Sequence, residues 1–457
     1  MKKRTLLPES ARKNVAPEKN RQYASVLKQM VDCKTVWTND GENRDEYRRF
    51  YQVVAEAFPN LHSKARRLTF GDGCFFYVLE GKNPRKNILL MSHHDVVDGG
   101  EGWDTDPFCA VEKEGALWGR GTVDTKTPLF AELQAAEELL AEGYDFEGIT
   151  LYIGSSHNEE VSGDGMVLAA EFFRQLGVRF DVILDEGGAI TSGLIPGVKA
   201  KSAVVAVHEK GRHLYRCTVR ESSEGHAGLN PTSGSPVATL SEFVTRVSKS
   251  KIFKASFAPE VQATFTRHAP YMSFPLNVVF GNFSLFSPII KKIMSKIPQA
   301  SAMISTGITF TSFHAGGEDN PQMKAKEAQA HMFLRCVREE DLQKELAEIR
   351  KIADEYGIEI QEVLRDYCRP SSFESRPFLV LEQILHENFP DVIVAPFLLT
   401  AGTDARRFSD LADSILRFAP IDLNKQQFSS IHGKNENITI RNIGQCVLFY
   451  KDFIRQI

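Results

Sequence analysis

Residues 87–91, with the sequence Asn-Ile-Leu-Leu-Met, form a short continuous apolar run that is followed directly by Ser92-His93-His94-Asp95. A run of this length is typical of a strand that is buried on both faces of a parallel sheet. The polar residues that follow would then lie at the carboxyl end of that strand, where open α/β sheets place their ligand sites. This stretch therefore predicts both a buried strand and a site at its end.

The same order of apolar run and polar end recurs at residues 149–153 and 181–184. The stretches between the three runs are rich in Ala, Leu and Glu, and they predict helices over 128–142 and 164–177. Strands that alternate with helices indicate an α/β fold with an open, mostly parallel sheet.

A smaller unit interrupts this pattern. Residues 202–219 resemble a long hairpin arm, whereas residues 252–300, rich in Phe, Lys and Pro, fit no regular pattern. The order β-α-β-β-α predicts an inserted α+β, ferredoxin-like domain, with its elements over 202–219, from about 236, and over 308–313, 328–335 and 339–356. We therefore expect a catalytic domain over 1–204 and 346–457, interrupted by a lid and dimerisation domain over 205–345.

Composition and charge exclude several classes of protein. The chain has 457 residues and a formal net charge of −4, so no general attraction to nucleic acid or to anionic lipid is expected. The basic N-terminus is not followed by an apolar run, so no secretory signal is predicted, and no apolar stretch approaches the length of a membrane span. Seven widely spaced cysteines suit a reducing compartment. We expect a cytoplasmic protein.

Acids and histidines gather where the predicted strands end. A buried cluster of carboxylates and imidazoles is repulsive or poorly solvated unless a cation satisfies it. Histidine nitrogen mixed with carboxylate oxygen suits zinc above all, and one carboxylate can bridge two ions about 3.5–4 Å apart. The candidates follow the three strands, a glycine-bearing turn at 119–123 and a distant loop: His93, Glu159, Glu160, Asp185, Glu186, Asp124 and His432.

Seven short motifs occur in a fixed order over most of the chain. Together they resemble metallopeptidase family twenty, which includes glutamate carboxypeptidase, aminoacylase, succinyl-diaminopimelate desuccinylase and yeast carboxypeptidase S. Two of them, LDEGG and GTDARRF, lean toward the carboxypeptidase S and aminoacylase branch. The motifs are HHDVV (93–97), WDTDPF (103–108), WGRGTVDTK (118–126), NEEVSGDG (158–165), LDEGG (184–188), GTDARRF (402–408) and IHGKNE (431–436).

The resemblance implies a hydrolase with two zinc ions per chain, which cobalt or manganese would be able to replace. It would cleave an amide bond in a short peptide or an N-acyl amino acid with a free carboxylate. The implied ligands are His93 and Glu186 for one ion, Glu160 and His432 for the other, and Asp124 for both. The two ions would lower the pKa of a shared water and polarise the scissile carbonyl.

Three further residues receive catalytic roles from the same resemblance. Glu159 would be the general base, and Asp95 would hold the ring of His93 in place. His226, in the segment Gly225–Gly228, resembles a histidine that reaches the active site of the partner subunit. A homodimer formed through the lid domain is therefore expected.

The residues that bind the substrate are less well defined. Arg406 is a candidate to hold a substrate carboxylate in a bidentate grip, with Arg407 as its alternative. The family's Asn-Val-Ile-Pro segment is replaced here by residues 319–323, Asp-Asn-Pro-Gln-Met, so Asn320 or Gln322 would take the place of its asparagine.

Two alternatives stay open. Asp185 competes with Glu186 as a metal ligand, since both follow the same predicted strand. The rival function is a catalytically silent dimeric binding protein on the same scaffold, which would be expected to have lost a ligand or the base. None of these residues is missing from the sequence, so a hydrolase is favoured. The residues do not distinguish dipeptidase, carboxypeptidase and deacylase activities.

Overall fold

The chain folds into two compact units. The computed structural model describes residues 3–38, 40–193, 195–220, 235–315 and 325–457. The first unit consists of Met1–His208, Ala263–Asn282 and Pro370–Ile457. The second unit consists of Glu209–Gln262 and Phe283–Arg369.

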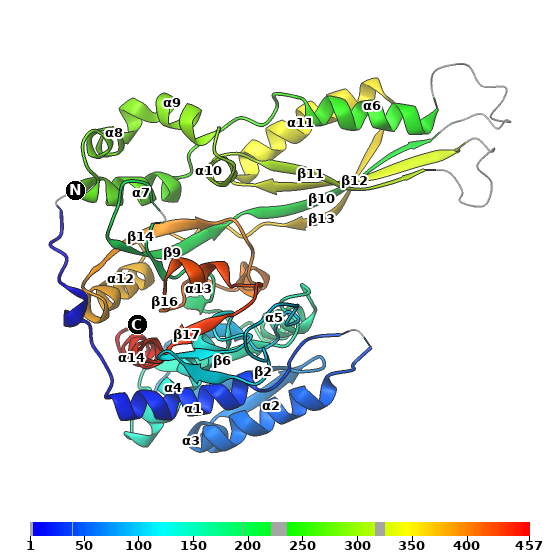
Figure 1. Ribbon diagram of the computed structural model, residues 1–457. Helices are drawn as coiled ribbons and strands as arrows, with labels where there is room; N and C mark the ends of the chain where they lie inside the picture. The colour runs from blue at the N-terminus through cyan, green and yellow to red at the C-terminus, as the bar shows by residue number, and fades with distance from the viewer. Residues whose placement is uncertain (1–2, 39, 194, 221–234, 316–324) are drawn as a thin grey trace. The chain divides into compact units, whose positions relative to one another are not determined.

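The first unit is built on a ten-stranded sheet (Figure 1). Its central strands β6, β3, β7 and β15 are parallel neighbours, and antiparallel strands extend the sheet on both sides. The predicted α/β fold class is confirmed. In spatial order the strands are β1 (Arg66–Phe70), β2 (Cys74–Glu80), β6 (Ile149–Ser156), β3 (Lys86–His93), β7 (Val182–Asp185), β15 (Ile415–Arg417), β9 (Lys201–Glu209), β8 (Ile190–Thr191) and β16 (Asp422–Leu423), while β14 (Val392–Leu399) pairs with β9.

Helices cover both faces of this sheet, because alternate side chains of a strand point to opposite faces. Ile88 and Leu90 of β3 lie in the main core, whereas Tyr152 of β6 contacts Phe173 of α5 on the other side. The helices of this unit include η1 (Glu9–Ala11), α1 (Pro17–Val31), α2 (Arg44–Ala57), α3 (Pro59–Lys64), α4 (Lys126–Ala141), α5 (Gly165–Gln175), η3 (Ala269–Tyr271), α12 (Arg376–Asn388), η4 (Asp404–Phe408), α13 (Lys425–Ser429) and α14 (Ile440–Gln456). A small separate sheet has the order β17 (Asn437–Thr439), β5 (Ala116–Trp118) and β4 (Val111–Lys113).

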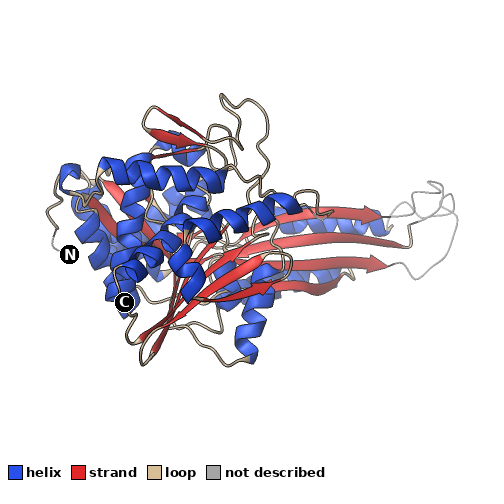
Figure 2. Cartoon of the chain, turned by 90° about the horizontal axis from the view of Figure 1, so that it is seen from below, coloured by secondary structure: helices blue, strands red, loops and turns tan. Residues whose placement is uncertain are grey.

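The second unit is a four-stranded antiparallel sheet with two helices on one face (Figure 2). Leu240 and Phe243 of α6 pack with Met332 and Leu334 of β12 in its core. The order along the chain, β-α-β-β-α-β, is that of the expected ferredoxin-like insertion. In spatial order the strands are β11 (Gly307–Ala315), β12 (Glu327–Cys336), β10 (Gly211–Arg220) and β13 (Glu359–Asp366), and the helices are α6 (Pro236–Ser248) and α11 (Glu339–Glu355). The domain boundary predicted after residue 345 falls within α11.

Two parts of the fold differ from the sequence-based expectation. The hairpin predicted over 202–219 is wrong, because β9 pairs within the large sheet, whereas β10 pairs with β12 and β13. The unplaced stretch 252–300 is largely helical, and its middle part, Ala263–Asn282, belongs to the first unit, where Thr264 donates a hydrogen bond to the carbonyl of Pro396 at 2.6 Å. Its helices are α7 (Pro259–His268), α8 (Leu276–Gly281), α9 (Phe283–Met294) and α10 (Pro298–Ala302).

Two further features concern membrane-spanning helices and the cysteines. Among the described residues, no helix combines the length and the apolar character that crossing a bilayer requires. All seven cysteines belong to the described residues, and each is a thiol; six are buried and Cys109 is exposed. The cytoplasmic location stays a prediction.

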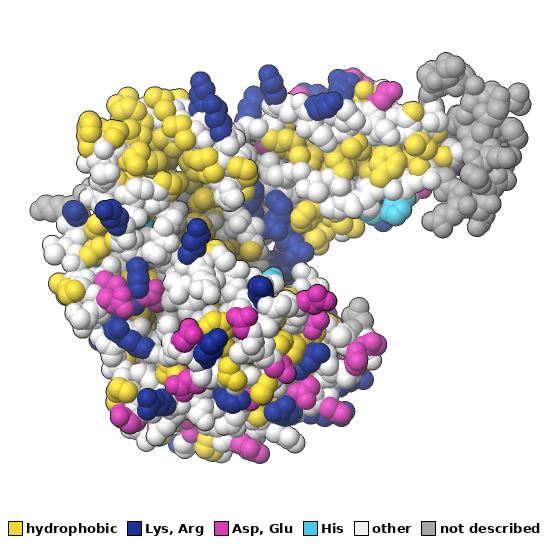
Figure 3. All heavy atoms as spheres, viewed as in Figure 1, with side chains coloured by type: hydrophobic (Ala, Val, Ile, Leu, Met, Phe, Trp, Pro, Cys, Tyr) yellow, Lys and Arg dark blue, Asp and Glu magenta, His cyan; other side chains and the backbone are white. Residues whose placement is uncertain are grey.

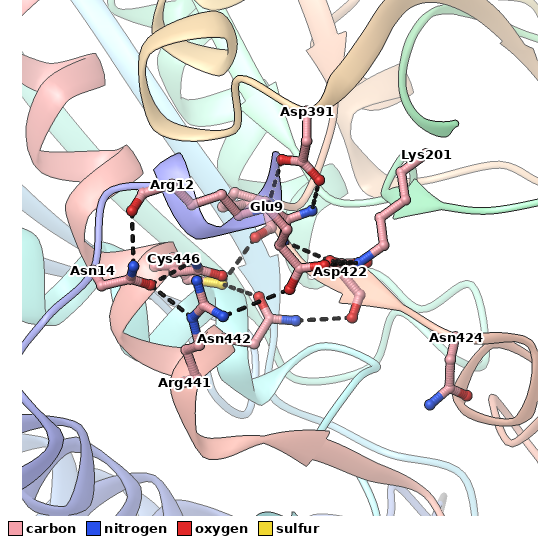
Figure 4. A network of polar contacts seen from close by, with 12 residues as sticks. Glu9, Arg12, Asn14, Lys201, Asp391, Asp422, Asn424, Arg441, Asn442 and Cys446 are labelled. Atoms are coloured by element: carbon pink, nitrogen blue, oxygen red, sulfur yellow. Dashed lines mark hydrogen bonds and ion pairs between the residues drawn. The ribbon is translucent and has the colours of Figure 1, made fainter. Parts of the chain in front are cut away.

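A buried arginine ties the N-terminal segment to the first unit (Figure 4). The side chain of Arg12 is 2% exposed and forms two hydrogen bonds of 2.6 Å with the carboxylate of Asp391. Its third nitrogen donates to Asp422 at 2.6 Å, and Lys201 pairs with the same carboxylate. Because the contacts are bidentate and largely buried, this network is expected to stabilise the fold more than a surface ion pair does.

We expect Arg12→Met to destabilise the protein by about 3–5 kcal/mol, because it leaves two largely buried carboxylates with less positive charge around them. Urea unfolding followed by circular dichroism measures this change. The matched control is Arg44→Met, which removes an ion pair with Asp72 whose two side chains are 61% and 58% exposed. Equal unfolding midpoints for the two variants would contradict a stabilising role for Arg12.

Candidate metal centre

The candidate site lies at the carboxyl ends of three neighbouring strands. β3 ends at His93 and β7 ends at Asp185. β6 ends at Ser156, and the chain then turns through Glu159 and Glu160. β6 and β7 both pair with β3 in parallel, so all three ends meet at one edge of the sheet, as predicted.

Two histidines and two carboxylates converge at this edge. Asp124 lies between the histidines: its Oδ1 is 3.1 Å from Nε2 of His93, and its Oδ2 is 3.1 Å from Nε2 of His432. The same nitrogen of His432 is 3.0 Å from Oε2 of Glu160. One ligand atom from each of His93, Asp124 and Glu160 lies within 4.8 Å of the others. A carboxylate that turns one oxygen to each of two histidines has the arrangement required to bridge two cations.

Asp95 fixes the backbone around these residues. Its side chain is fully buried, and its two carboxylate oxygens accept the amide N–H groups of Glu159 at 3.1 Å and Glu160 at 3.0 Å. Nδ1 of His93 lies 2.9 Å from the backbone carbonyl of Asp95 and 3.4 Å from its carboxylate. Asp95 therefore orients the His93 ring and the turn that carries both glutamates.

A second group of acids surrounds the other side of His93. The carboxylate of Asp185 accepts the amide N–H groups of Glu186 and Ala405, both at 2.9 Å. Both of its oxygens are thereby directed to the backbone. The residues that line this small enclosed space include His93, Glu159, Asp185, Glu186 and Asp404.

The electrostatics of this space favour a cation. Burial and the neighbouring Asp404 raise the pKa of Glu159 well above its usual range. Burial, Asp185 and Asp124 do the same to the pKa of Glu186, and burial with Asp404 raises the pKa of Asp185 to about 6. Like charges that are buried together disfavour ionisation unless positive charge is supplied. The donor set and its charge therefore fit divalent metal ions.

Glu436 connects the two halves of the cluster, which are more than 300 residues apart in sequence. It is fully buried and accepts the amide N–H of Asp124 at 3.0 Å. Its other oxygen pairs with Arg120 at 2.8 Å, and Arg120 also donates to the carbonyl of Gly433 at 2.6 Å. Gly433 follows His432, whose φ of 55° lies in the sparsely populated left-handed region. The Arg120–Glu436 pair thus holds the Asp124 turn and the His432 loop together.

The comparisons with known proteins agree with this geometry. The model of peptidase family M20/M25/M40 matches residues 89–456. The chain belongs to this family. It is 29% identical over 442 residues to the N-fatty-acyl-amino acid synthase/hydrolase PM20D1 of Mus musculus, a match that covers 94% of this chain and 86% of that protein. It is 28% identical over 446 residues to the probable carboxypeptidase S-like 2 of Dictyostelium discoideum, covering 95% and 85%.

Solved structures of the M20 family share the fold. The M20 family metallo-carboxypeptidase Sso-CP2 of Sulfolobus solfataricus superposes with a TM-score of 0.64 at 15% identity, covering 95% of this chain and 99% of that chain. YXEP of Bacillus subtilis, described as a dinuclear metal binding peptidase from the M20 family, gives 0.59 at 10% identity, covering 97% and 100%. The family and the hydrolase class predicted from the motifs are confirmed.

Of the remaining residues predicted for the site, the structure describes some and not others. Arg406 is buried and donates a hydrogen bond to the carbonyl of Thr403 at 2.7 Å, while Arg407 beside it is half-buried. His226 and Asn320 lie outside the described residues. The roles given to these residues stay predictions.

Sequence reasoning did not single out three charged residues that organise the centre. Arg120, Asp404 and Glu436 stand inside M20 motifs, but a motif match does not tell which acid binds a ligand and which one holds the backbone. A signal was present in one case: the glycine-bearing turn around Arg120 leaves backbone N–H groups that need an acceptor, and the carboxylate of Glu436 accepts those of Gly121, Val123 and Asp124. Its partner Glu436 comes from the far end of the chain, so the pairing required the fold.

We expect Glu436→Gln to weaken metal binding about 10- to 100-fold, as changes behind metal ligands commonly do. The new amide NH₂ group would face N–H donors, since every contact of this carboxylate is to a donor. Titration of the metal-free protein with zinc in competition with a chromophoric chelator measures the affinity. Glu112→Gln, at an exposed position of β4, is the control, and a folded Glu436→Gln protein with unchanged affinity would contradict the positioning role.

Proposed function

We propose that this M20 protein is a two-metal amide hydrolase that cleaves N-acyl amino acids or short peptides with a free carboxylate. The observation that carries the proposal is the position of Asp124, whose two oxygens each lie 3.1 Å from a different histidine. The names of the relatives, an N-fatty-acyl-amino acid synthase/hydrolase and a carboxypeptidase S-like protein, support an N-acyl amino acid as the substrate.

The proposed ligands divide into two sets around Asp124. His93 and Glu186 would hold one ion, and Glu160 and His432 the other. Glu186 is preferred to Asp185, because both oxygens of Asp185 accept backbone N–H groups. Histidine nitrogen with carboxylate oxygen suits zinc, which cobalt or manganese would be able to replace. When bound, the two cations would lower the pKa of a water and polarise the scissile carbonyl.

Glu159 is proposed as the group that moves the proton. Its backbone is held by Asp95 through the amide hydrogen bond of 3.1 Å, and its side chain lines the same enclosed space as His93 and Glu186. The adjacent Glu160 instead reaches His432, so the two glutamates serve different functions. Glu159 accepts a proton from the attacking water and donates it to the leaving nitrogen, which then departs as an amine.

Substrate recognition is proposed to involve the residues to which the resemblance gives this role. Arg406 or Arg407 would bind the carboxylate of the amino acid, and Asn320 would shape the substrate end of the site. His226 of a second copy would donate to the developing oxyanion, so that full activity requires a homodimer.

We expect Glu159→Gln to lower kcat by about 10²- to 10⁴-fold, because the amide cannot accept the proton of the water. Metal content, measured by elemental analysis, should stay at the value of the unmodified protein. Glu171→Gln on the exposed face of α5 is the control and should keep full activity. Unchanged turnover in Glu159→Gln would remove Glu159 as the base.

Metal removal tests the function as a whole. We expect about two divalent ions per chain by elemental analysis, and loss of hydrolysis after dialysis against a chelator. The substrate panel should contain dipeptides and N-acyl amino acids with acyl chains of increasing length, with release of the free amino acid as the measured product. Zinc should restore the activity. Metal bound without cleavage of any member of the panel would favour the silent binding protein, and absence of metal affinity would refute the proposed ligand set.

A further inference from the structure

An apolar stripe on α9 is exposed to solvent. Leu285, Ile289 and Ile293 follow one another at intervals of four residues and are 75%, 56% and 57% exposed, and Ile297 just beyond the helix is 46% exposed. Residues at this spacing share one face of a helix. The hydrophobic side chains that gather over α9 are visible in Figure 3. Large aliphatic side chains grouped on one surface mark an interaction site more often than scattered ones do.

The opposite face of α9 is already used within the second unit. Phe283, Ile290 and Met294 are buried, and the ring of Phe283 meets the ring of Phe257 edge-on with centroids 4.7 Å apart. The buried face therefore packs α9 within the second unit, and the stripe is left exposed.

The charged residues of α9, and of the sequence on either side of it, are all basic. Lys292 and Lys296 are exposed. Lys292 lies in α9 between Ile289 and Ile293, and Lys296 lies two residues beyond the end of the helix. No Asp or Glu occurs in the sequence between Glu260 and Glu318. Lysines among exposed apolar residues are typical of helices that lie on anionic membranes, where the apolar side chains enter the acyl boundary and the ammonium groups reach the phosphates.

We propose that α9 docks the protein on the surface of an anionic lipid bilayer. The net charge of −4 predicts no such attraction, but the potential that a surface senses is local within about 8–10 Å, the screening length at physiological salt. A second copy of the chain is the less favoured occupant, because a symmetric contact through this face would bring the lysines of both copies together without an acid from the same segment. The inference does not depend on the proposed amide hydrolysis.

The test is flotation of the full chain with vesicles of phosphatidylcholine alone and with vesicles that also contain phosphatidylglycerol. The protein should float with the anionic vesicles, bind the neutral ones weakly, and dissociate as the salt concentration rises. The triple variant Leu285→Gln/Ile289→Gln/Ile293→Gln should lose binding to both. Lys292→Gln/Lys296→Gln should lose about 25-fold in affinity for the anionic vesicles, about fivefold for each lysine.

Matched controls separate docking from loss of the fold. Lys344→Gln/Lys351→Gln removes two exposed lysines from α11 and should bind like the unmodified chain. Circular dichroism and metal content should be unchanged in all variants. Absence of flotation by the unmodified protein, or full binding by the triple variant, would overturn the proposal. A concentration-dependent dimer in sedimentation that the triple variant abolishes would assign the stripe to a second copy instead.

Discussion

The repulsion between carboxylates buried at one edge of the large sheet is the constraint on which the site depends. The fold offsets this repulsion for some of the acids: Asp95 and Asp185 accept backbone N–H groups, and Glu436 accepts both N–H groups and a guanidinium. Burial and like-charged neighbours raise the pKa of Glu159 and Glu186, and they raise the pKa of Asp185 to about 6 despite its backbone hydrogen bonds. Asp95 and Asp185 hold the backbone with both carboxylate oxygens, whereas the side chains of Glu159 and Glu186 line the small space beside His93.

The residues of the centre are positioned by contacts between distant parts of the chain. Asp124 is placed by the backbone of its own turn, and the amide of that turn is held by Glu436 from the end of the chain. The same ion pair with Arg120 fixes the loop of His432 through Gly433. Because residues near 120 and near 435 hold each other, neither half of the cluster is positioned until the first unit has closed around its sheet.

The sequence predicted those parts of the protein that local chemistry determines. Buried strands such as β3 and β6 are continuous apolar runs, and candidate ligands follow them directly. The position of the site at one edge of the sheet, and the cluster of His93, Asp124, Glu160 and His432, could therefore be predicted from the sequence. Which strands pair is decided by contacts that are distant in sequence. Residues 202–219 read as a hairpin because two strand patterns are separated by one short break, yet β9 and β10 join different sheets. The return of α7 to the first unit depends on single contacts, such as that of Thr264 with Pro396, which leave no periodic signal.

The exposed stripe of α9 is another feature that the sequence pattern alone could not predict. An amphipathic pattern does not state whether its apolar face meets a core or solvent, and α9 has apolar residues on both faces. Helix α9 packs through the buried side chains of Phe283, Ile290 and Met294, so it gains little folding stability from Leu285 or Ile289 on its exposed face. Folding alone therefore does not require apolar residues at those positions, whereas contact with an apolar surface outside the chain does.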